Sequence, residues 1–389
     1  MFRLKPLALL IGLLGTTHSY AASNTADLTQ SGAQNTAALT QTGQGNHSVQ
    51  VQLGTDTRQT VLQTGELNAA SIYQGERTRG TIDIDQSGES HLVEIYQDTR
   101  GWSTVAVTQR GSVNEVRIDQ GSNNAGRVTS YQEGTHNLHD FRLENMSGTP
   151  SLSARTLGNG NTMRVVQGED AQYFMDADLV QNGDNNLIDL QQQWRRQEAE
   201  VNQQGNGNIV QVQQSGLGPI EGELSGSLMQ ASQNGNDNVM NVRQGSDGNT
   251  LISSQNGDRN TLDVQQWGWS GYLTTKMTNR LEATVNGNDN RMTVVQMGGA
   301  GAHEITAEQT GNNNEMNLSQ RNTTDSSLDM AQRGDGLVMT VTQMNTQNDH
   351  FALVQEGTNH TLSLERSGIG NEAIVSQLGT ANMASMIQQ

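Results

Sequence analysis

The stretch that decides the fold is Gln30-Ser31-Gly32-Ala33-Gln34-Asn35-Thr36-Ala37-Ala38-Leu39-Thr40-Gln41. Its first half predicts a turn, because glycine adopts positive φ at little cost and asparagine tolerates the left-handed region and bonds to nearby backbone. Its second half predicts a strand, because an Asn, two aliphatic residues and a Gln occupy alternate positions. Residues two apart in a strand share a face. The inward face is therefore expected to consist of Asn35, Ala37, Leu39 and Gln41.

The same unit recurs along the chain, marked by glutamines that lie 11 or 12 residues apart. The markers are Gln30, Gln41, Gln52, Gln63, Gln74, Gln86, Gln97, Gln109, Gln120 and Gln132, and later Gln309, Gln320, Gln332, Gln343, Gln355, Gln377 and Gln388, with Arg366 in one marker place. Two similar halves make a repeat of 22 to 23 residues. A period of this size is typical of stacked repeat folds. We expect an all-β solenoid of about fifteen two-strand coils, with two parallel in-register sheets.

Stacked coils place each amide over its copy in the next coil, and this satisfies polar groups whose unpaired burial costs roughly 1–3 kcal/mol each. The expected self-assembly ladder consists of Gln30, Asn35, Gln41, Asn46, Gln63, Asn68, Gln74, Gln109, Asn114, Gln120, Gln181, Asn186, Gln255, Asn260, Gln266, Gln309, Asn314, Gln320, Asn371, Gln377, Asn382 and Gln388. The expected turn glycines are Gly32, Gly43, Gly65, Gly111, Gly183, Gly257, Gly311 and Gly379.

The repeat is expected to run from 28 to 389, after a short segment at 22–27. The regular spacing of markers fails around Pro150, where Asn145 and Leu157 are taken as markers. It also fails in two places where loop insertions are expected, near 215–232 and 267–285. The marker after the second insertion is taken as Asn286. The second insertion holds Trp267, Trp269 and Tyr272. They suggest either an exposed platform for a glycan or a partner fibre, or loop residues folded back on a sheet face, which we favour because surface aromatics often only pack locally.

Residues 1–21 are expected to be a signal peptide, with basic Arg3 and Lys5, an apolar run from Leu7 to Leu14 and cleavage after Ala21. The apolar run is too short to span a membrane. Removing the two basic residues takes the net charge from −18 to −20, which argues against nucleic acid and anionic membrane surfaces as partners. We expect no membrane insertion. With no cysteine and only 32% hydrophobic residues, amide ladders must supply the stability.

The sequence predicts no enzyme, cofactor or metal site. The histidines are scattered, and His91 and His360 take the inward asparagine position. Pairs such as Asp83 and Asp85, or Asp176 and Asp178, share a face at strand spacing and are expected on a solvated outer face. Acidic turns lack the repeat that places calcium ligands in β-rolls.

The QxGxxN turn, the strand pattern NxAxxxQ of Asn35 to Gln41 and Asn371 to Gln377, and the repeat period resemble the curlin repeat of curli fibre subunits. This resemblance implies a secreted bacterial surface protein that assembles head to tail into amyloid fibres of the biofilm matrix. It also implies another curlin subunit and curli-type secretion and nucleation proteins as partners. The chain differs from familiar curlins in its larger number of repeats, its degenerate coils and its short N-terminal segment.

The strand from Asn382 to Gln388 shows no capping segment, and open edges built from one ladder predict a filament that grows without closing. The alternatives are a monomeric solenoid adhesin and a minor subunit that nucleates another curlin. An ice-binding face is disfavoured because the outward positions mix Thr, Arg, Asp and Ser. A β-helix enzyme lacks an active-site motif, and a leucine-rich repeat lacks the LxxLxL pattern.

Overall fold

The computed structural model describes residues 23–121, 126–144, 149–168, 175–194, 196–216, 226–246, 248–268, 278–298 and 301–389. The expected signal peptide at 1–21 lies outside the described residues, as do Asn145, Trp269 and Tyr272. Within these ranges the chain forms strands and turns, and none of the described residues forms a helix long and apolar enough to cross a membrane.

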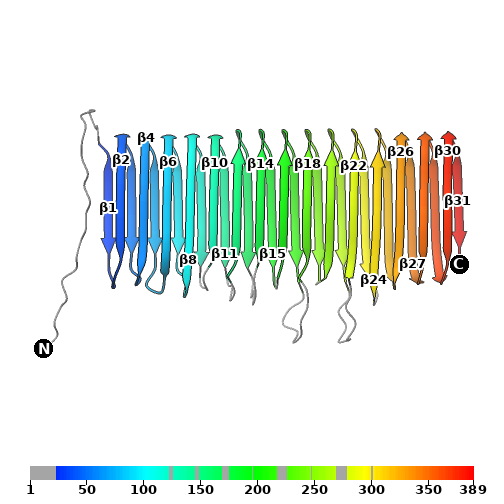
Figure 1. Ribbon diagram of the computed structural model, residues 1–389, viewed down its shortest axis with the longest axis horizontal. Helices are drawn as coiled ribbons and strands as arrows, with labels where there is room; N and C mark the ends of the chain where they lie inside the picture. Colours follow the sequence, from blue (N-terminus) through cyan, green and yellow to red (C-terminus); the bar gives the residue numbers. More distant parts are fainter. Residues whose placement is uncertain are drawn as a thin grey trace.

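The strands form two parallel sheets that run side by side along a straight stack, with β1 and β31 at opposite ends (Figure 1). The 16-stranded sheet contains the odd strands in order: β1 (Thr25–Gln30), β3 (His47–Gln52), β5 (Ala69–Gln74), β7 (Leu92–Gln97), β9 (Glu115–Gly121), β11 (Leu138–Glu144), β13 (Thr162–Gly168), β15 (Leu187–Gln193), β17 (Ile209–Ser215), β19 (Val239–Gly245), β21 (Thr261–Trp267), β23 (Arg291–Gly298), β25 (Glu315–Thr323), β27 (Val338–Gln347), β29 (Thr361–Ile369) and β31 (Met383–Gln388).

The 15-stranded sheet contains the even strands: β2 (Thr36–Gln44), β4 (Thr57–Glu66), β6 (Arg79–Glu89), β8 (Trp102–Ser112), β10 (Arg127–Thr135), β12 (Ser151–Leu157), β14 (Asp176–Asn182), β16 (Glu198–Gln204), β18 (Leu228–Asn234), β20 (Asn249–Asn256), β22 (Thr278–Asn286), β24 (Ala302–Thr310), β26 (Ser326–Asp335), β28 (His350–Thr358) and β30 (Glu372–Thr380). Each strand pairs with the strand one coil away, as in Gln41 opposite Gln63. The expected all-β solenoid with two parallel sheets is confirmed.

Burial alternates along each strand, as the period of two predicts. In β6, Ile82, Ile84 and Gln86 are buried, whereas Asp83 lies on the outer face. The two sheets thus enclose a narrow core of aliphatic side chains bordered by buried glutamines and asparagines. Each coil needs only a few apolar residues because its neighbours above and below complete their burial. This explains how a chain with 32% hydrophobic residues forms a continuous core.

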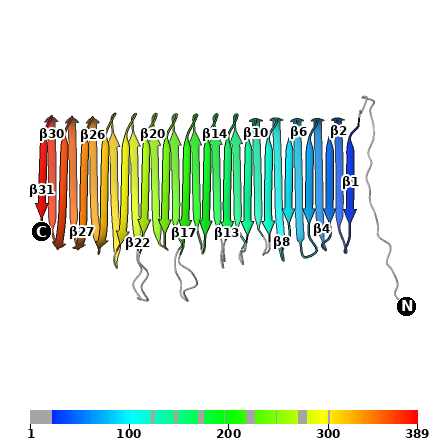
Figure 2. The same ribbon diagram turned by 180° about the vertical axis from the view of Figure 1, so that it is seen from behind.

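The two edges of the solenoid differ. Turns from even to odd strands form what we call the glycine edge, which lies at the top in Figure 1 and keeps one turn geometry from coil to coil. Connections from odd to even strands form the variable edge. Ladder glutamines in neighbouring coils are 22 residues apart at Gln41 and Gln63 but 30 apart at Gln203 and Gln233. The difference arises at the variable edge, where β17 ends at Ser215 and β18 begins at Leu228 (Figure 2).

Three expected marker positions need correction. The ladder position in β12 is Thr156 rather than Leu157, and in β22 it is Val285 rather than Asn286, because these residues pair with Gln181 and Gln255. In β11 the ladder residue is Leu143, opposite Gln120 and Gln167. A shift of one residue turns a side chain to the other face, so a marker cannot be located by spacing alone where glutamine is replaced.

The strand ends also differ from the expected boundaries. β1 begins at Thr25, before the expected start of the repeat at 28. β18 and β22 begin at Leu228 and Thr278, inside the ranges 215–232 and 267–285 expected for the insertions. These strand starts carry no glutamine marker, so the spacing of glutamines assigns them to the preceding loop.

Candidate self-assembly ladders

A ladder of glutamine side chains runs along the interior of each sheet. In the 15-stranded sheet, Nε2 of Gln63 donates to Oε1 of Gln86 at 2.8 Å and to the carbonyl of His47 in the opposite sheet at 3.0 Å. One amide therefore joins neighbouring coils and also joins the two sheets. The same donor direction holds at the far end, where Gln355 Nε2 donates to Gln377 Oε1 at 2.8 Å.

The structure places the expected glutamines in these two ladders. Gln30, Gln74, Gln120, Gln266, Gln320 and Gln388 lie in the 16-stranded sheet, and Gln41, Gln63, Gln109, Gln181, Gln255, Gln309 and Gln377 lie in the 15-stranded sheet. In the 16-stranded sheet the bonds include Gln97 to Gln120 at 2.6 Å and Gln266 to Gln296 at 2.8 Å. Most of these side chains are buried, whereas Gln30, Gln41 and Gln388 in the end coils are half-buried.

Asparagines form a further ladder at the glycine edge. Oδ1 of Asn46 accepts from both the backbone N–H and Nδ2 of Asn68, each at 3.0 Å. Nδ2 of Asn68 also donates to the carbonyl of Gly88 at 3.1 Å, so the side chain closes its own turn against the next coil. Asn46, Asn68, Asn114, Asn186, Asn260, Asn314 and Asn382 lie in this ladder, whereas Asn35 and Asn371 lie at the variable edge.

Glycine is required at the turn that precedes each of these asparagines. Gly257 has φ +110°, and a Cβ there would lie 2.0 Å from the carbonyl oxygen of Gly287 in the next coil. The contact is repeated from Gly43 to Gly357, so backbone stacks directly on backbone. Gly43, Gly65, Gly111, Gly183, Gly257, Gly311 and Gly379 lie at the glycine edge, and Gly32 lies at the variable edge.

Two histidines replace asparagine in this ladder, as expected. The backbone N–H of Asn114 donates to Nδ1 of His91 at 3.3 Å, and His360 Nδ1 accepts from Asn382 in the same way at 3.0 Å. Burial lowers the pKa of His91, although hydrogen bonds to backbone act in the opposite direction. A neutral imidazole can accept at Nδ1 and donate at Nε2, which is how it replaces the amide.

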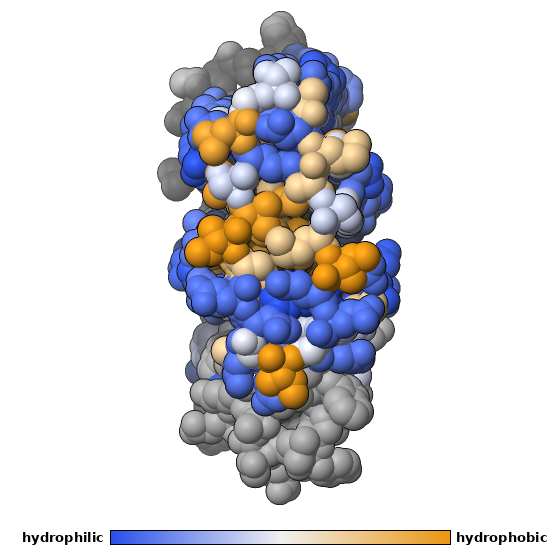
Figure 3. All heavy atoms as spheres, turned by 90° about the vertical axis from the view of Figure 1, so that its right-hand side faces the viewer, coloured by the Kyte–Doolittle hydropathy of each residue, from blue (hydrophilic) through white to orange (hydrophobic). Residues whose placement is uncertain are grey.

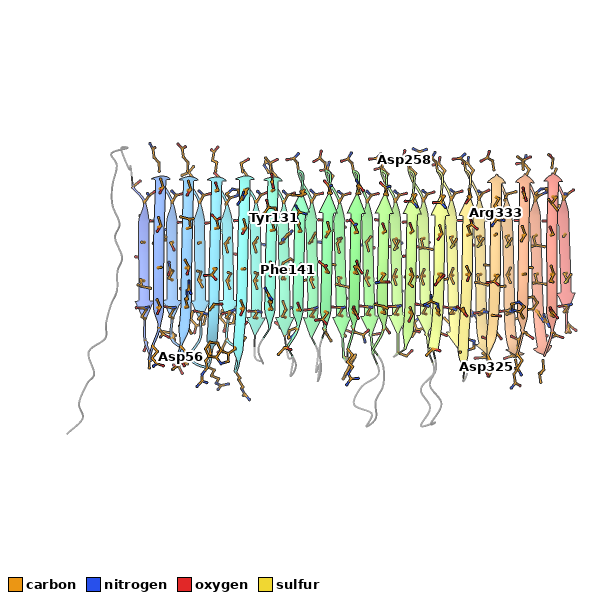
Figure 4. The ribbon with its side chains drawn as sticks, viewed as in Figure 1. Asp56, Tyr131, Phe141, Asp258, Asp325 and Arg333 are labelled. Carbon is orange, nitrogen blue, oxygen red and sulfur yellow. The ribbon has the colours of Figure 1, made fainter. Side chains whose placement is uncertain are left out.

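A second, outer ladder at the glycine edge was not expected from the sequence. The side chain that follows the turn glycine accepts a backbone N–H of the previous coil through Oδ1, as Asp258 does from Asn236 at 2.8 Å. Asp258 lies at this edge in Figure 4. The members of this outer ladder are Asn159, Asp184, Asn206, Asn236, Asp258, Asn288, Asn312 and Asp335. The sequence feature that indicates this outer ladder is the Gly-Asn or Gly-Asp pair that recurs at these turns.

The glutamine ladders are interrupted where the marker residue is not glutamine. Val285 separates Gln255 from Gln309, whose Oε1 is buried without a partner. At Arg366 the guanidinium lies 4.3 Å over the Phe351 ring and 3.6 Å from Asp349, with both charged side chains fully buried. Burial lowers the pKa of Arg366, and Asp349 opposes this shift. These interruptions divide the ladders into segments.

Among the described residues, no group of three His, Asp or Glu side chains is arranged to hold a metal ion. Asp83, Asp85, Asp176 and Asp178 lie on the outer faces of β6 and β14, away from the core. Trp267 also lies on an outer face, at the end of β21, and is 45% exposed.

One known family model matches the first coil of the chain. Residues 21–49 match the model of the curlin associated repeat. The chain contains a curlin repeat. This match includes β1, β2 and the start of β3, and most of the later coils carry buried glutamines and asparagines at the corresponding positions. Curlin repeats form a structural family rather than an enzyme family. None of the curated proteins and none of the solved structures matches the chain.

Proposed function

We propose that the chain is a secreted structural protein that assembles head to tail into extracellular functional amyloid of the curli kind, for biofilm matrix and surface adhesion. The observation that carries this proposal is the constant direction of the glutamine ladders. In every bond of the glutamine ladders, Nε2 of one coil donates to Oε1 of the next, from Gln30 and Gln41 to Gln355. In the glutamine ladders, one end of the stack therefore offers amide donors and the other offers amide oxygens as acceptors.

The end coils leave core side chains partly exposed, where another coil could cover them. The hydrophobic residues that pack on the core without being fully buried are Leu39 in β2, Val375 in β30, and Ala384 and Met386 in β31. Figure 3 looks onto the end that carries β31, where hydrophobic residues gather across the middle of the face and hydrophilic residues surround them. A second copy placed on this face would bury them and continue both sheets.

In the head-to-tail contact, Gln377 and Gln388 would donate to Gln41 and Gln30 of the next copy. The proposed partners of the chain are copies of itself, a second curlin subunit, and the secretion and nucleation proteins of a curli-type system. We further propose export through the periplasm to the bacterial cell surface, with the signal peptide removed after Ala21. A stack of this kind has the strand spacing of about 4.7–4.8 Å and the sheet spacing of about 10 Å that define cross-β fibres.

Assembly of residues 22–389 tests the proposal. We expect thioflavin fluorescence to rise after a lag, preformed fragments to shorten the lag, and fibre diffraction to show reflections at about 4.7 and 10 Å. A chain that stays a soluble monomer for days would contradict the proposal and leave a monomeric solenoid adhesin.

A matched pair of variants locates the contact. Met386→Asp places a charge on the inward side of β31, where the next copy would stack, and we expect elongation to slow by at least about tenfold. Ser385→Asp places the same charge on the outward side of the same strand and is expected to change the rate by less than about twofold. Equal rates for the two variants would show that growth does not use this end.

A further inference from the structure

The outer face of the 16-stranded sheet contains a groove that the ladders do not use. It crosses β15, β17, β19, β21 and β23, is open to solvent, and has a volume of about 620 Å³. That volume is within the range of small-molecule sites. Two columns of outward side chains line it: Asp189, Gln211, Asn241, Asp263 and Thr293 in one, and Gln191, Gln213, Arg243 and Gln265 in the other. The groove therefore follows the axis of the stack.

The second column contains polar side chains that are free to bind a ligand. Gln191, Gln213, Arg243 and Gln265 lie in register on four successive strands. Their side chains form no hydrogen bond within the described part of the chain. Glutamine amides both donate and accept, and the guanidinium donates, so this column can hydrogen-bond to hydroxyl groups. Strands about 4.8 Å apart repeat these groups along the groove, which favours a linear polymer over a single small molecule.

The groove is close to neutral although the chain is strongly acidic. Asp263 accepts from Nδ2 of Asn241 at 2.7 Å and forms an ion pair with Arg291 at 3.2 Å. Asp189 and Arg243, in neighbouring columns, offset one another in charge. A neutral ligand is thus favoured over an anionic one, which the overall charge of −18 would also repel.

An aromatic ring lies on the same face of the sheet, just beyond the residues that line the groove. Trp267 lies two residues beyond Gln265 on the same face, and its indole ring covers Gly245 of the neighbouring strand. A Cβ on Gly245 would lie 2.5 Å from Cε3 of the ring, so any larger residue there would displace the ring. Gly245 is buried although it faces outward, whereas Trp267 remains 45% exposed. The arrangement holds an aromatic surface beside a column of unpaired amides.

We propose that this groove binds a neutral polysaccharide chain that lies along the solenoid axis. The amides and Arg243 bond to the sugar hydroxyls, and the exposed part of Trp267 packs on the apolar face of a sugar ring. A second copy of the chain is a less suitable occupant, because the close contact of two amide-rich sheets needs flat faces and Trp267 projects from this one.

Binding of cellohexaose to the freshly purified soluble chain tests this proposal by calorimetry, independently of fibre formation. We expect saturable binding of the hexasaccharide, at least about tenfold tighter than binding of glucose, because several strands take part. Absence of binding at millimolar cellohexaose would overturn the proposal. Binding of polygalacturonate in preference to cellohexaose would overturn the neutral specificity.

Three single substitutions test whether the sugar binds beside Trp267. Trp267→Ala is expected to weaken cellohexaose binding about tenfold, and Gly245→Ala to weaken it severalfold because the new Cβ displaces the ring. Trp102→Ala removes a tryptophan that is 59% exposed and lies away from the groove, and it is expected to leave the affinity unchanged. Equal losses for Trp102→Ala and Trp267→Ala would overturn the assignment. So would a Trp267→Ala variant that changes the bundling of fibres and not the binding of sugar.

Discussion

The glycine edge and the variable edge join the same two sheets, yet they tolerate change very differently. At the glycine edge each turn contacts the next through backbone atoms, as Gly257 does with Gly287, and two asparagine-type ladders run beside it. At the variable edge the connection from β17 to β18 is much longer than that from β15 to β16. The difference shows that one edge defines the coil, whereas the other only connects its strands.

Insertions give the largest expected effect. Gly-Ser-Gly-Ser placed between Asn236 and Asp237 at the glycine edge interrupts both asparagine ladders, and we expect a loss of more than about 4 kcal/mol in unfolding free energy. The same insertion after Gly216 at the variable edge is expected to cost about 0.6 kcal/mol or less, since loop length matters weakly. Urea unfolding followed by circular dichroism measures both. Equal losses would show that the edges are equivalent.

Glycine substitutions give the next largest effect. Gly257→Ala adds a Cβ against the Gly287 carbonyl at positive φ, and we expect a loss of about 2–4 kcal/mol. Gly121→Ala, at the variable-edge end of β9, meets no atom closer than 3.7 Å and is expected to change stability by less than about 0.5 kcal/mol. Chemical denaturation of the two variants gives the comparison, and a harmless Gly257→Ala would refute the backbone contact.

Closing a ladder gap is expected to stabilise the chain. Val285→Gln would accept from Gln255 and donate to the unpaired Oε1 of Gln309, with a gain of about 1 kcal/mol. Thr284→Gln, on the outward side of the same strand, is the control and is expected to stay within about 0.5 kcal/mol. A destabilised Val285→Gln variant would mean that the core beside Val285 cannot admit the amide.

The smallest expected effect concerns pH at the glycine edge. Burial lowers the pKa of His91 below 6.5, so below that pH the unfolded state binds more protons and stability falls as the pH falls. His91→Asn should reduce the loss of stability between pH 7 and pH 5, measured by urea midpoints. A smaller slope is expected to remain, because burial lowers the pKa of His139 to about 3 and gives the same sign.

His350→Gln is the control for this experiment, because His350 is exposed at the start of β28. We expect it to leave the pH dependence of the midpoint as in the unsubstituted chain. An unchanged slope in His91→Asn would show that the imidazole in the asparagine ladder does not contribute to acid sensitivity.

Prediction from the sequence succeeded where a residue carries its own structural preference. Gln41 and Gln63 were assigned to one inward column by spacing, and the structure joins them at 2.8 Å. It failed at Thr156 and Val285, where the marker is missing and a shift of one residue reverses the face. The buried pair of Arg366 and Asp349 was also missed in part, because Arg366 was recognised only as a marker substitute and its partner comes from another strand connection.

By itself, the sequence determined the coil: turn glycines, strands of period two, and an interior of aliphatic and amide side chains. These features depend on residues a few positions apart, through backbone conformation and side-chain alternation. Only the tertiary structure decided which turns share an edge, that Asn236 and Asp258 belong to an outer ladder, and that the ring of Trp267 covers Gly245. Such contacts join residues 22 to 30 positions apart. The connections between coils differ in length, so the register of one coil against the next becomes visible only when the coils are stacked.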